Sequence, residues 1–167
     1  MRKLMTLIAL LALPFALQAQ TKFHDVEMND AKGPVKKITQ NVMGQEQTNS
    51  FTPDGKQEGL TDAVYDADGY LQSAKNQAQG MSATATYTWE NGKVKTITMN
   101  LMGNDMTIVN NYDEKGLLIS NTMNAGGQEM TMPYTDYKFD EKGNWISRKV
   151  SMMGQEMETP RTIEYYE

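Results

Sequence analysis

A short turn motif recurs along this 167-residue chain and constrains its fold more than any other feature of the sequence. The motif is an aromatic residue followed by Asp, two variable residues, Gly, one further residue and an apolar residue. Asp can accept a hydrogen bond from the backbone two residues on, and Gly takes the left-handed conformation that closes a type I turn with a bulge. Each copy therefore predicts the tip of a β-hairpin. The full copies are Tyr65, Asp66, Gly69 and Leu71; Tyr112, Asp113, Gly116 and Leu118; and Phe139, Asp140, Gly143 and Trp145.

The same turn geometry predicts which residues face one another across each hairpin. The expected pairs are Tyr65 with Leu71, Tyr112 with Leu118, and Phe139 with Trp145. Cross-strand pairs of aromatic and aliphatic side chains contribute about 0.2–1 kcal/mol each. Looser copies, which lack the aromatic-Asp pair, close at Gly55 and Gly92.

A second kind of turn, in which Gly follows Met, alternates with the first. Its copies are Met43-Gly44, Met102-Gly103 and Met153-Gly154, with Gly126 in a longer version and Gly80 in a degenerate one. Gly at the first central position suits a two-residue type II′ loop. Because two turn classes alternate at regular spacing, the chain is predicted to be all-β. The expected fold is an antiparallel up-and-down meander of about ten strands, an open curved sheet rather than a closed barrel.

Side-chain alternation predicts that one face of this sheet is buried. A turn at Gly103-Asn104 would pair Met99 with Ile108 and place both on the buried face. Two strands break this alternation, because Leu118 is out of phase with Ile119 and Trp145 is out of phase with Ile146. Either bulges shift the register or parts of both faces are covered, and bulges are the favoured interpretation.

The first residues have the pattern of a secretory signal peptide. Residues 1–19 begin with Arg2 and Lys3, continue with an apolar stretch and end at Ala19. Residues 20–33, here called the lead-in, are polar and are interpreted as an approach segment that could add an edge strand. The β-hairpin repeat domain is then 34–167. The protein is therefore expected to be periplasmic or secreted.

Charge and composition limit the expected partners. Removal of the signal peptide changes the formal charge from −5 to −7, because it takes away two cations and no acid. An acidic chain without basic clusters argues against nucleic acid and anionic membrane surfaces as partners. No membrane span is expected after cleavage, while a protein or glycan partner and an edge-to-edge dimer stay open. The chain has no Cys, so neither a disulfide nor a lipid attached to Cys can form.

The sequence offers little catalytic or metal chemistry. His24 is the one histidine, and most acids lie where turns require them, so no catalytic residue, cofactor or metal ligand is assigned. Asp66-Ala67-Asp68-Gly69 is similar to the start of a calcium loop but lacks the later acidic ligands, so a plain turn is favoured. The chain has 14 Met, and thioethers bind soft metals such as Cu(I). Packing of Met on the strand face is the favoured interpretation.

At its turn motifs the chain resembles the tyrosine-aspartate (YD, or RHS) repeats of bacterial surface and secreted proteins. The residues that carry the resemblance are the three full motif copies given above, and the likeness covers most of the chain after the signal peptide. The resemblance implies a β-rich structural role rather than catalysis. Gly143-Asn144-Trp145 is also similar to a feature of small exported envelope proteins of unknown function.

These observations predict an exported, non-catalytic β-repeat module with a binding or structural role in the cell envelope. The alternative is a lipocalin-like β-barrel that binds a small apolar ligand. An enzyme is the third hypothesis, and it would need polar groups that converge in a pocket.

Overall fold

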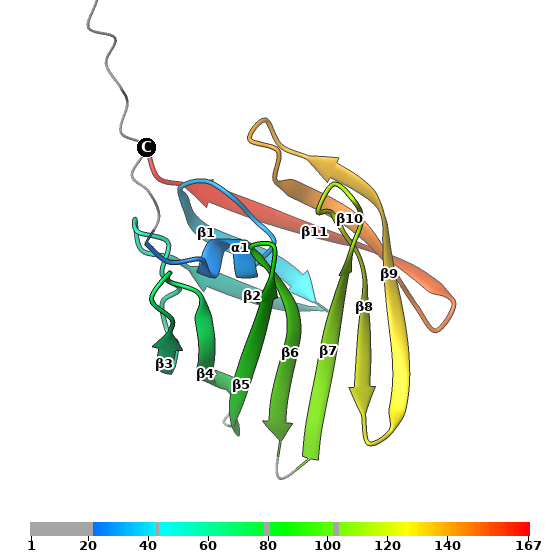
Figure 1. Ribbon diagram of the computed structural model, residues 1–167. Helices are drawn as coiled ribbons and strands as arrows, with labels where there is room; N and C mark the ends of the chain where they lie inside the picture. The colour runs from blue at the N-terminus through cyan, green and yellow to red at the C-terminus, as the bar shows by residue number, and fades with distance from the viewer. Residues whose placement is uncertain (1–21, 43, 79–80, 102–103) are drawn as a thin grey trace, which may run out of the picture.

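The chain folds into one antiparallel sheet and one short helix (Figure 1). The computed structural model describes residues 22–42, 44–78, 81–101 and 104–167. Within them, eleven strands run up and down, which confirms the predicted all-β meander. The elements are α1 (Asp25–Met28), β1 (Val35–Val42), β2 (Gln45–Ser50), β3 (Thr61–Tyr65), β4 (Leu71–Ala78), β5 (Met81–Glu90), β6 (Lys93–Leu101), β7 (Asn104–Tyr112), β8 (Leu118–Ala125), β9 (Gln128–Phe139), β10 (Trp145–Met152) and β11 (Gln155–Tyr165).

The sheet is open, and its opening lies between two strands that follow one another in the chain. The strand order is β2-β1-β11-β10-β9-β8-β7-β6-β5-β4-β3, so the free edges are β2 and β3. The first strand pairs with the last, with Ile38 opposite Ile163. Figure 1 shows the sheet curled around α1, which lies on its concave side. The prediction of an open curved sheet rather than a closed barrel is confirmed.

The turn motif forms the hairpins that the sequence predicts. Asp113 shows the common geometry: its Oδ1 accepts hydrogen bonds from the backbone N–H of Lys115 (2.9 Å) and Leu117 (2.8 Å). The turn closes with Gly116 N–H donating to the Asp113 carbonyl at 2.9 Å. The predicted cross-strand pairs are all present: Tyr65 with Leu71, Tyr112 with Leu118, and Phe139 with Trp145.

The two-residue turns differ from the prediction. Met153 and Gly154 both have positive φ (50° and 78°) and lie between the paired Met152 and Gln155. This is the signature of a type I′ turn with Gly second, so the predicted type II′ turn with Gly first is wrong here. The type I′ turn is favoured because its twist matches that of the flanking strands.

Two further turns belong to this class. Gly126-Gly127 is a two-residue loop between Ala125 and Gln128, so the longer loop predicted there is wrong. Asn91-Gly92 is also a two-residue loop, between Glu90 and Lys93, and not a copy of the Asp-x-x-Gly turn. The predictions for Met43, Gly80, Met102 and Gly103 lie outside the described residues.

The register of β6 and β7 differs from the prediction by two residues. Met99 pairs with Met106 and Ile97 pairs with Ile108, whereas Met99 was expected opposite Ile108. A shift of two residues keeps each side chain on its own face, because side chains alternate with period two. The expected set of apolar residues therefore still shares one face.

Bulges account for the strands that lose their alternation. The register of the β7–β8 pair shifts between Asn111 and Tyr112, opposite Leu118 and its neighbours. The register of the β9–β10 pair shifts after Trp145. Leu118 is consequently buried while Ile119 is 42% exposed. The favoured interpretation, that bulges rather than two covered faces break the pattern, is confirmed.

The lead-in is part of the hydrophobic core. Its described residues add no edge strand, the option that the sequence left open, because residues 25–28 form α1 and the segment packs on the concave face. Val26 and Ala31 join Val35, Ile38 and Phe51 in one buried cluster. Burying a side chain of the size of Val contributes about 1.5–3 kcal/mol, which explains why a polar segment is drawn inward at these positions.

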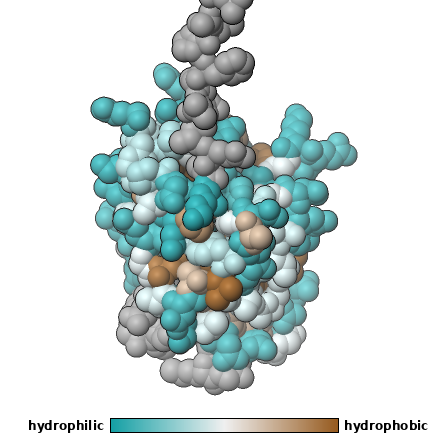
Figure 2. All heavy atoms as spheres, turned by 60° about the vertical axis from the view of Figure 1, so that its left-hand side comes forward, coloured by the Kyte–Doolittle hydropathy of each residue, from teal (hydrophilic) through white to brown (hydrophobic). Residues whose placement is uncertain are grey.

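The free edges of the sheet are polar or short. β2 reads Gln45-Glu46-Gln47-Thr48-Asn49-Ser50, and β3 has five residues, of which Val64 is 54% exposed. Figure 2, in which the left-hand side of Figure 1 comes forward, shows a small apolar area among hydrophilic side chains. Short or polar edges discourage pairing with another sheet.

Replacing Gly69 with Ala should destabilise the protein more than replacing Gly126 with Ala. Both glycines have positive φ, where an L-residue costs about 1–2 kcal/mol. A Cβ on Gly69 would also lie 1.9 Å from the Lys22 carbonyl oxygen, whereas one on Gly126 would meet nothing within 4 Å. The lead-in backbone would have to move, at an additional cost of about 1–3 kcal/mol. Urea denaturation followed by tryptophan fluorescence measures both losses. Equal losses would contradict tight docking of the lead-in.

Candidate functional site

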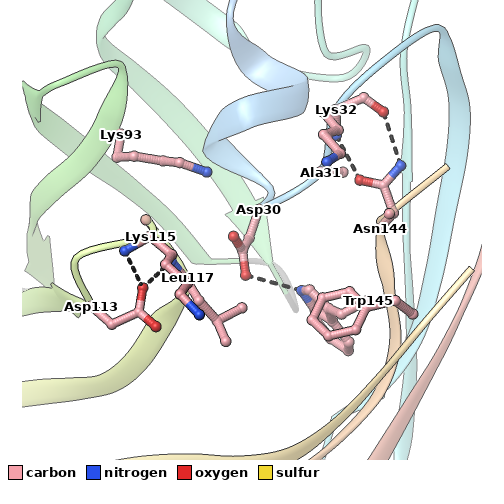
Figure 3. A pocket seen from close by; sticks show the side chains of 12 residues that line it. Asp30, Ala31, Lys32, Lys93, Asp113, Lys115, Leu117, Asn144 and Trp145 are labelled. Carbon is pink, nitrogen blue, oxygen red and sulfur yellow. Dashed lines mark hydrogen bonds between the residues drawn. The ribbon is translucent and has the colours of Figure 1, made fainter.

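The turn motifs and the lead-in together frame a pocket of about 450 Å³ (Figure 3). Motif residues that line it are Asp113, Gly116, Phe139, Gly143 and Trp145, and the remaining lining residues are Asp30, Ala31, Lys32, Lys93, Lys115, Leu117 and Asn144. The motif residues Tyr65, Asp66, Gly69, Leu71, Leu118 and Asp140 do not line this pocket. Tyr112 lines a neighbouring pocket between the β5–β6 and β7–β8 turns. The structure thus brings two of the three motif copies together.

Asn144 ties the lead-in to this end of the sheet. Its Nδ2 donates to the Lys32 carbonyl (2.9 Å) and to the Tyr165 hydroxyl (2.8 Å), and its Oδ1 accepts from Lys32 N–H (2.8 Å). Asn144 is only 3% exposed, so these hydrogen bonds replace the ones that its side-chain amide would make to water in the unfolded chain. The Asn of Gly143-Asn144-Trp145 therefore holds the lead-in in place.

Trp145 lies between two guanidinium groups. The Arg161 Cζ is 3.6 Å from the ring centroid and the Arg148 Cζ is 4.2 Å from it. Its indole N–H donates to Asp30 Oδ2 at 3.0 Å. Such cation–π contacts are strongest when the cation is removed from water. Arg161 is 5% exposed, so this condition is met for its contact with Trp145.

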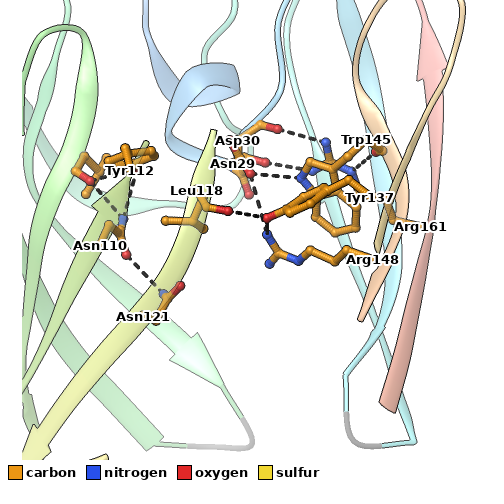
Figure 4. Close-up of polar contacts among 11 residues, drawn as sticks. Asn29, Asp30, Asn110, Tyr112, Leu118, Asn121, Tyr137, Trp145, Arg148 and Arg161 are labelled. Carbon is orange, nitrogen blue, oxygen red and sulfur yellow. Dashed lines mark hydrogen bonds and ion pairs between the residues drawn. The ribbon is translucent and has the colours of Figure 1, made fainter. Parts of the chain in front are cut away.

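Arg161 binds backbone carbonyls rather than a carboxylate. Its Nε donates to the Trp145 carbonyl (2.6 Å), Nη1 to that of Asn29 (3.0 Å) and Nη2 to that of Asp30 (2.8 Å), as Figure 4 shows. Arg161 is 5% exposed, and burial lowers its pKa to about 10. These bonds join β10, β11 and the lead-in across the concave side.

Asp30 is the acid among these cations. Its Oδ2 lies 3.6 Å from Arg148 Nη1, and in Figure 3 Lys93 extends toward it. Burial raises the pKa of Asp30, and Arg148, Lys93 and Arg161 oppose that effect. We call the group formed by Asp30, Tyr137, Trp145, Arg148 and Arg161 the polar layer.

Arg148 is only partly satisfied within the polar layer. Its Nη1 donates to the Tyr137 hydroxyl at 3.2 Å, and its guanidinium stacks on Tyr134 with Cζ 3.7 Å from the ring centroid. Its buried Nε has no hydrogen-bond partner in the described residues. On β8, two strands away from β10 in the sheet, Asn121 donates to Asn110 Oδ1 at 3.1 Å, but its own Oδ1 has no partner among the described residues. Figure 4 shows both side chains on the concave side.

The concave face beyond the polar layer is rich in methionine. Strand pairing places Met99 opposite Met106, Met123 opposite Met130, Met132 opposite Asn121, and Met157 opposite Val150. Because direct cross-strand partners share a face, these residues stand on the same side as Asn121 and Arg148. We call the surface formed by Ile97, Met99, Met106, Ile108, Met123, Met130, Met132, Val150, Met152 and Met157 the methionine face. All ten side chains are partly exposed.

The methionines therefore pack on a strand face, as the favoured sequence interpretation predicts. Met153, beside a turn glycine, is 89% exposed and stands apart from the others. In the described part of the chain, no group of three His, Cys, Asp or Glu side chains could hold a metal ion.

The sequence analysis missed Asp30, Asn144, Arg148 and Arg161. One signal was available: after Arg2, the chain has only two arginines, Arg148 and Arg161, against thirteen lysines. Arginine is the cation better suited to burial and to stacking on aromatic rings. Nothing in the local pattern places Asp30, because its partners are more than 100 residues away.

Comparison with known proteins gives little further information. No family model matches the chain, and no curated protein matches it. Among solved structures, the chain is similar to a porin-like protein from Bacteroides uniformis ATCC 8492, with 12% identity over 79% of this chain and 98% of that chain. The TM-score of 0.24 is too low for this likeness to carry an argument. Among the described residues, no helix has the length and apolar character needed to cross a bilayer.

The lead-in is also held at Asp25, in a different environment. Asp25 is fully buried, and its Oδ2 accepts hydrogen bonds from Gln57 N–H (2.7 Å) and the Tyr65 hydroxyl (2.6 Å). Its Oδ1 has no partner among the described residues. Burial raises the pKa of Asp25, and the hydrogen bonds from Tyr65 and Gln57 only partly offset this.

The raised pKa of Asp25 predicts a pH-dependent difference between the wild type and the variant Asp25→Asn. In the unfolded chain the carboxyl ionises near its ordinary pKa of 3.8, whereas in the fold it keeps its proton to higher pH. Between pH 3.8 and the raised pKa of the folded state, the folded protein binds more protons than the unfolded chain. The contribution of Asp25 to wild-type stability therefore falls as the pH rises through this range. The amide does not titrate. The free energy of unfolding of the variant, relative to wild type, should therefore rise from about pH 4 upward and then level off. Urea denaturation across this range measures it, and a flat or falling difference would contradict the assignment.

Proposed function

We propose that this protein is an exported, non-catalytic β-sheet module that binds a small amphipathic ligand on its concave face. The observation that carries the proposal is the methionine face, whose partly exposed apolar side chains adjoin the polar layer. Ligand sites are typically apolar surfaces with a few polar groups that fix orientation. Two polar atoms without partners among the described residues lie at the boundary between the methionine face and the polar layer. They are the donor Nε of Arg148 and the acceptor Oδ1 of Asn121.

Methionine suits such a role. Its unbranched thioether side chain adapts to irregular shapes, and methionine-rich surfaces bind varied apolar partners. A sheet with a purely structural role would gain more from branched side chains packed on one another. The open, curled sheet supports ligand binding without the closed barrel of the alternative hypothesis.

The pocket at the turn end is less suited to a ligand. Asp113 Oδ1 accepts hydrogen bonds within its own turn, and Asn144 is hydrogen-bonded to the lead-in. Asp30 accepts a hydrogen bond from Trp145. These three polar groups thus already have structural partners. Its aromatic Trp145 is covered by two arginines, so it offers no open ring for stacking.

The assignment as non-catalytic is supported by the use of the titratable groups. His24 stacks on Tyr70, with ring centroids 3.9 Å apart, and lies 3.7 Å from Glu27. Asp66, Asp113 and Asp140 accept backbone hydrogen bonds within their own turns. Export to the periplasm or beyond is supported by the signal-peptide pattern in residues 1–19.

Fluorescence of N-phenyl-1-naphthylamine, a neutral apolar probe, tests the proposal. The purified protein should enhance the fluorescence of the probe with a saturable, one-to-one titration. Replacing Met123 with Glu places a charge on the methionine face and should weaken binding by about tenfold or more, which corresponds to about 1.4 kcal/mol. The matched control is Met153→Glu, because Met153 is 89% exposed on a turn. It should leave the affinity within about twofold.

Two outcomes would refute this function. One is the absence of saturable enhancement by the wild-type protein. The other is an equal loss in both variants, which would place the probe elsewhere. Urea denaturation of each variant shows whether any loss of binding follows from unfolding.

A further inference from the structure

We infer that the ligand is a single-chain carboxylic acid, with its carboxylate at Arg148 and its hydrocarbon chain along the methionine face. This inference rests on the proposed function and names the chemical class of the ligand. It commits to a monomeric small molecule and not to a lipid bilayer.

The surroundings of the polar layer carry more positive than negative charge. Arg161 is buried and Arg148 is largely buried, and Asp30 is the one acid in the layer. Lys93 also acts on Asp30, and Asp140 acts on Arg161. Buried charges are normally paired, because an unpaired one loses its hydration without compensation. The layer therefore has an excess of positive charge that an anionic ligand would balance.

The Arg148 guanidinium has one edge on which Nε lacks a partner in the described chain. Its Nη1 faces Tyr137 and Asp30, and all hydrogen bonds that the structure gives Arg148 are on this side. Nε and Nη2 form the other edge of the planar group, and Nε has no partner in the described chain. Two parallel N–H donors on one edge match the two oxygens of a carboxylate. The Arg148 side chain keeps 12% of its surface exposed, but Nε itself is buried, so a carboxylate that binds both donors must displace the side chains that cover Nε.

The methionine face is long enough for a hydrocarbon chain that starts at Arg148. From Arg148, strand β10 runs four residues to Met152. Four residues of strand span about 13 Å, the length of an extended chain of roughly ten carbons. Val150 and Met152 lie along this path, and Met157 pairs with Val150.

Calorimetric titration with three ten-carbon probes tests the inference: decanoate, 1-decanol and decyltrimethylammonium, each below the concentration at which it aggregates. The full-length purified protein should bind decanoate about tenfold or more tightly than either of the others. The variant Arg148→Gln should lose this preference and keep its affinity for 1-decanol within about twofold. The matched control is Lys149→Gln, which removes the same charge from the next residue. Lys149 pairs with Asp136 and Glu156 on the opposite face, so the preference for decanoate should persist.

A second variant keeps the test decisive if Arg148→Gln does not fold. Val150→Asp leaves Arg148 in place and puts a carboxylate two residues along the same face. Decanoate should then lose more affinity than 1-decanol, and decyltrimethylammonium should gain. Thermal unfolding of each variant shows that it is folded.

The outcomes separate this inference from the proposed function. If all three probes bind the wild type equally, the face is a ligand site but the carboxylate assignment is wrong. If decanoate is preferred equally by the wild type and by folded Arg148→Gln, the headgroup binds elsewhere and the inference is wrong. If none of the probes binds, the proposed function fails together with the inference. Adsorption to vesicles containing anionic phospholipid, without binding of monomeric decanoate, would also overturn it.

Discussion

Arg161 must satisfy its donors inside the protein, and the way it does so organises one end of the molecule. The three carbonyls that it binds belong to the lead-in and to the start of β10. A guanidinium without these acceptors would lose its hydration and gain little in return. The lead-in is therefore not an accessory to the sheet but the source of acceptors without which the residue could not be buried. The same contacts position Trp145 and Asp30. These two residues in turn contact Arg148 and position it.

Local chemistry determines the hairpins, and it could be predicted from the sequence. In each full copy of the motif, Asp, Gly and the aromatic residue act within seven residues of chain, so pairs such as Tyr112 with Leu118 follow from the sequence alone. The bulges at Leu118 and Trp145 were also predictable, because a loss of alternation shows in the sequence. The form of the Met-Gly turns was not: type I′ and type II′ loops have the same length and differ only in which central residues take positive φ.

The candidate site could not be predicted, because distant segments build it. Asp30 meets Trp145 and Arg161 across 115 and 131 residues. The polar composition of the lead-in predicts an approach segment outside the core, whereas its few apolar residues and Asp25 are buried in the structure. The methionine face was partly visible as an alternation of Met and Ile. Its position next to Arg148 and Arg161 depends on the curl of the sheet, which the sequence pattern does not indicate.

The pairing of β1 with β11 has a consequence for how the protein is made. The earliest strand to emerge has its inner neighbour at the far end of the polypeptide, and the acceptors for Arg161 lie in the lead-in that precedes it. Strands β3 to β10 can pair with their sequence neighbours as they appear, but the N-terminal hairpin must wait for the last residues. Contacts between distant segments slow folding. Completion of the sheet therefore has to await β11, and a chain threaded in extended form across a membrane would reach its native structure only after β11 had crossed.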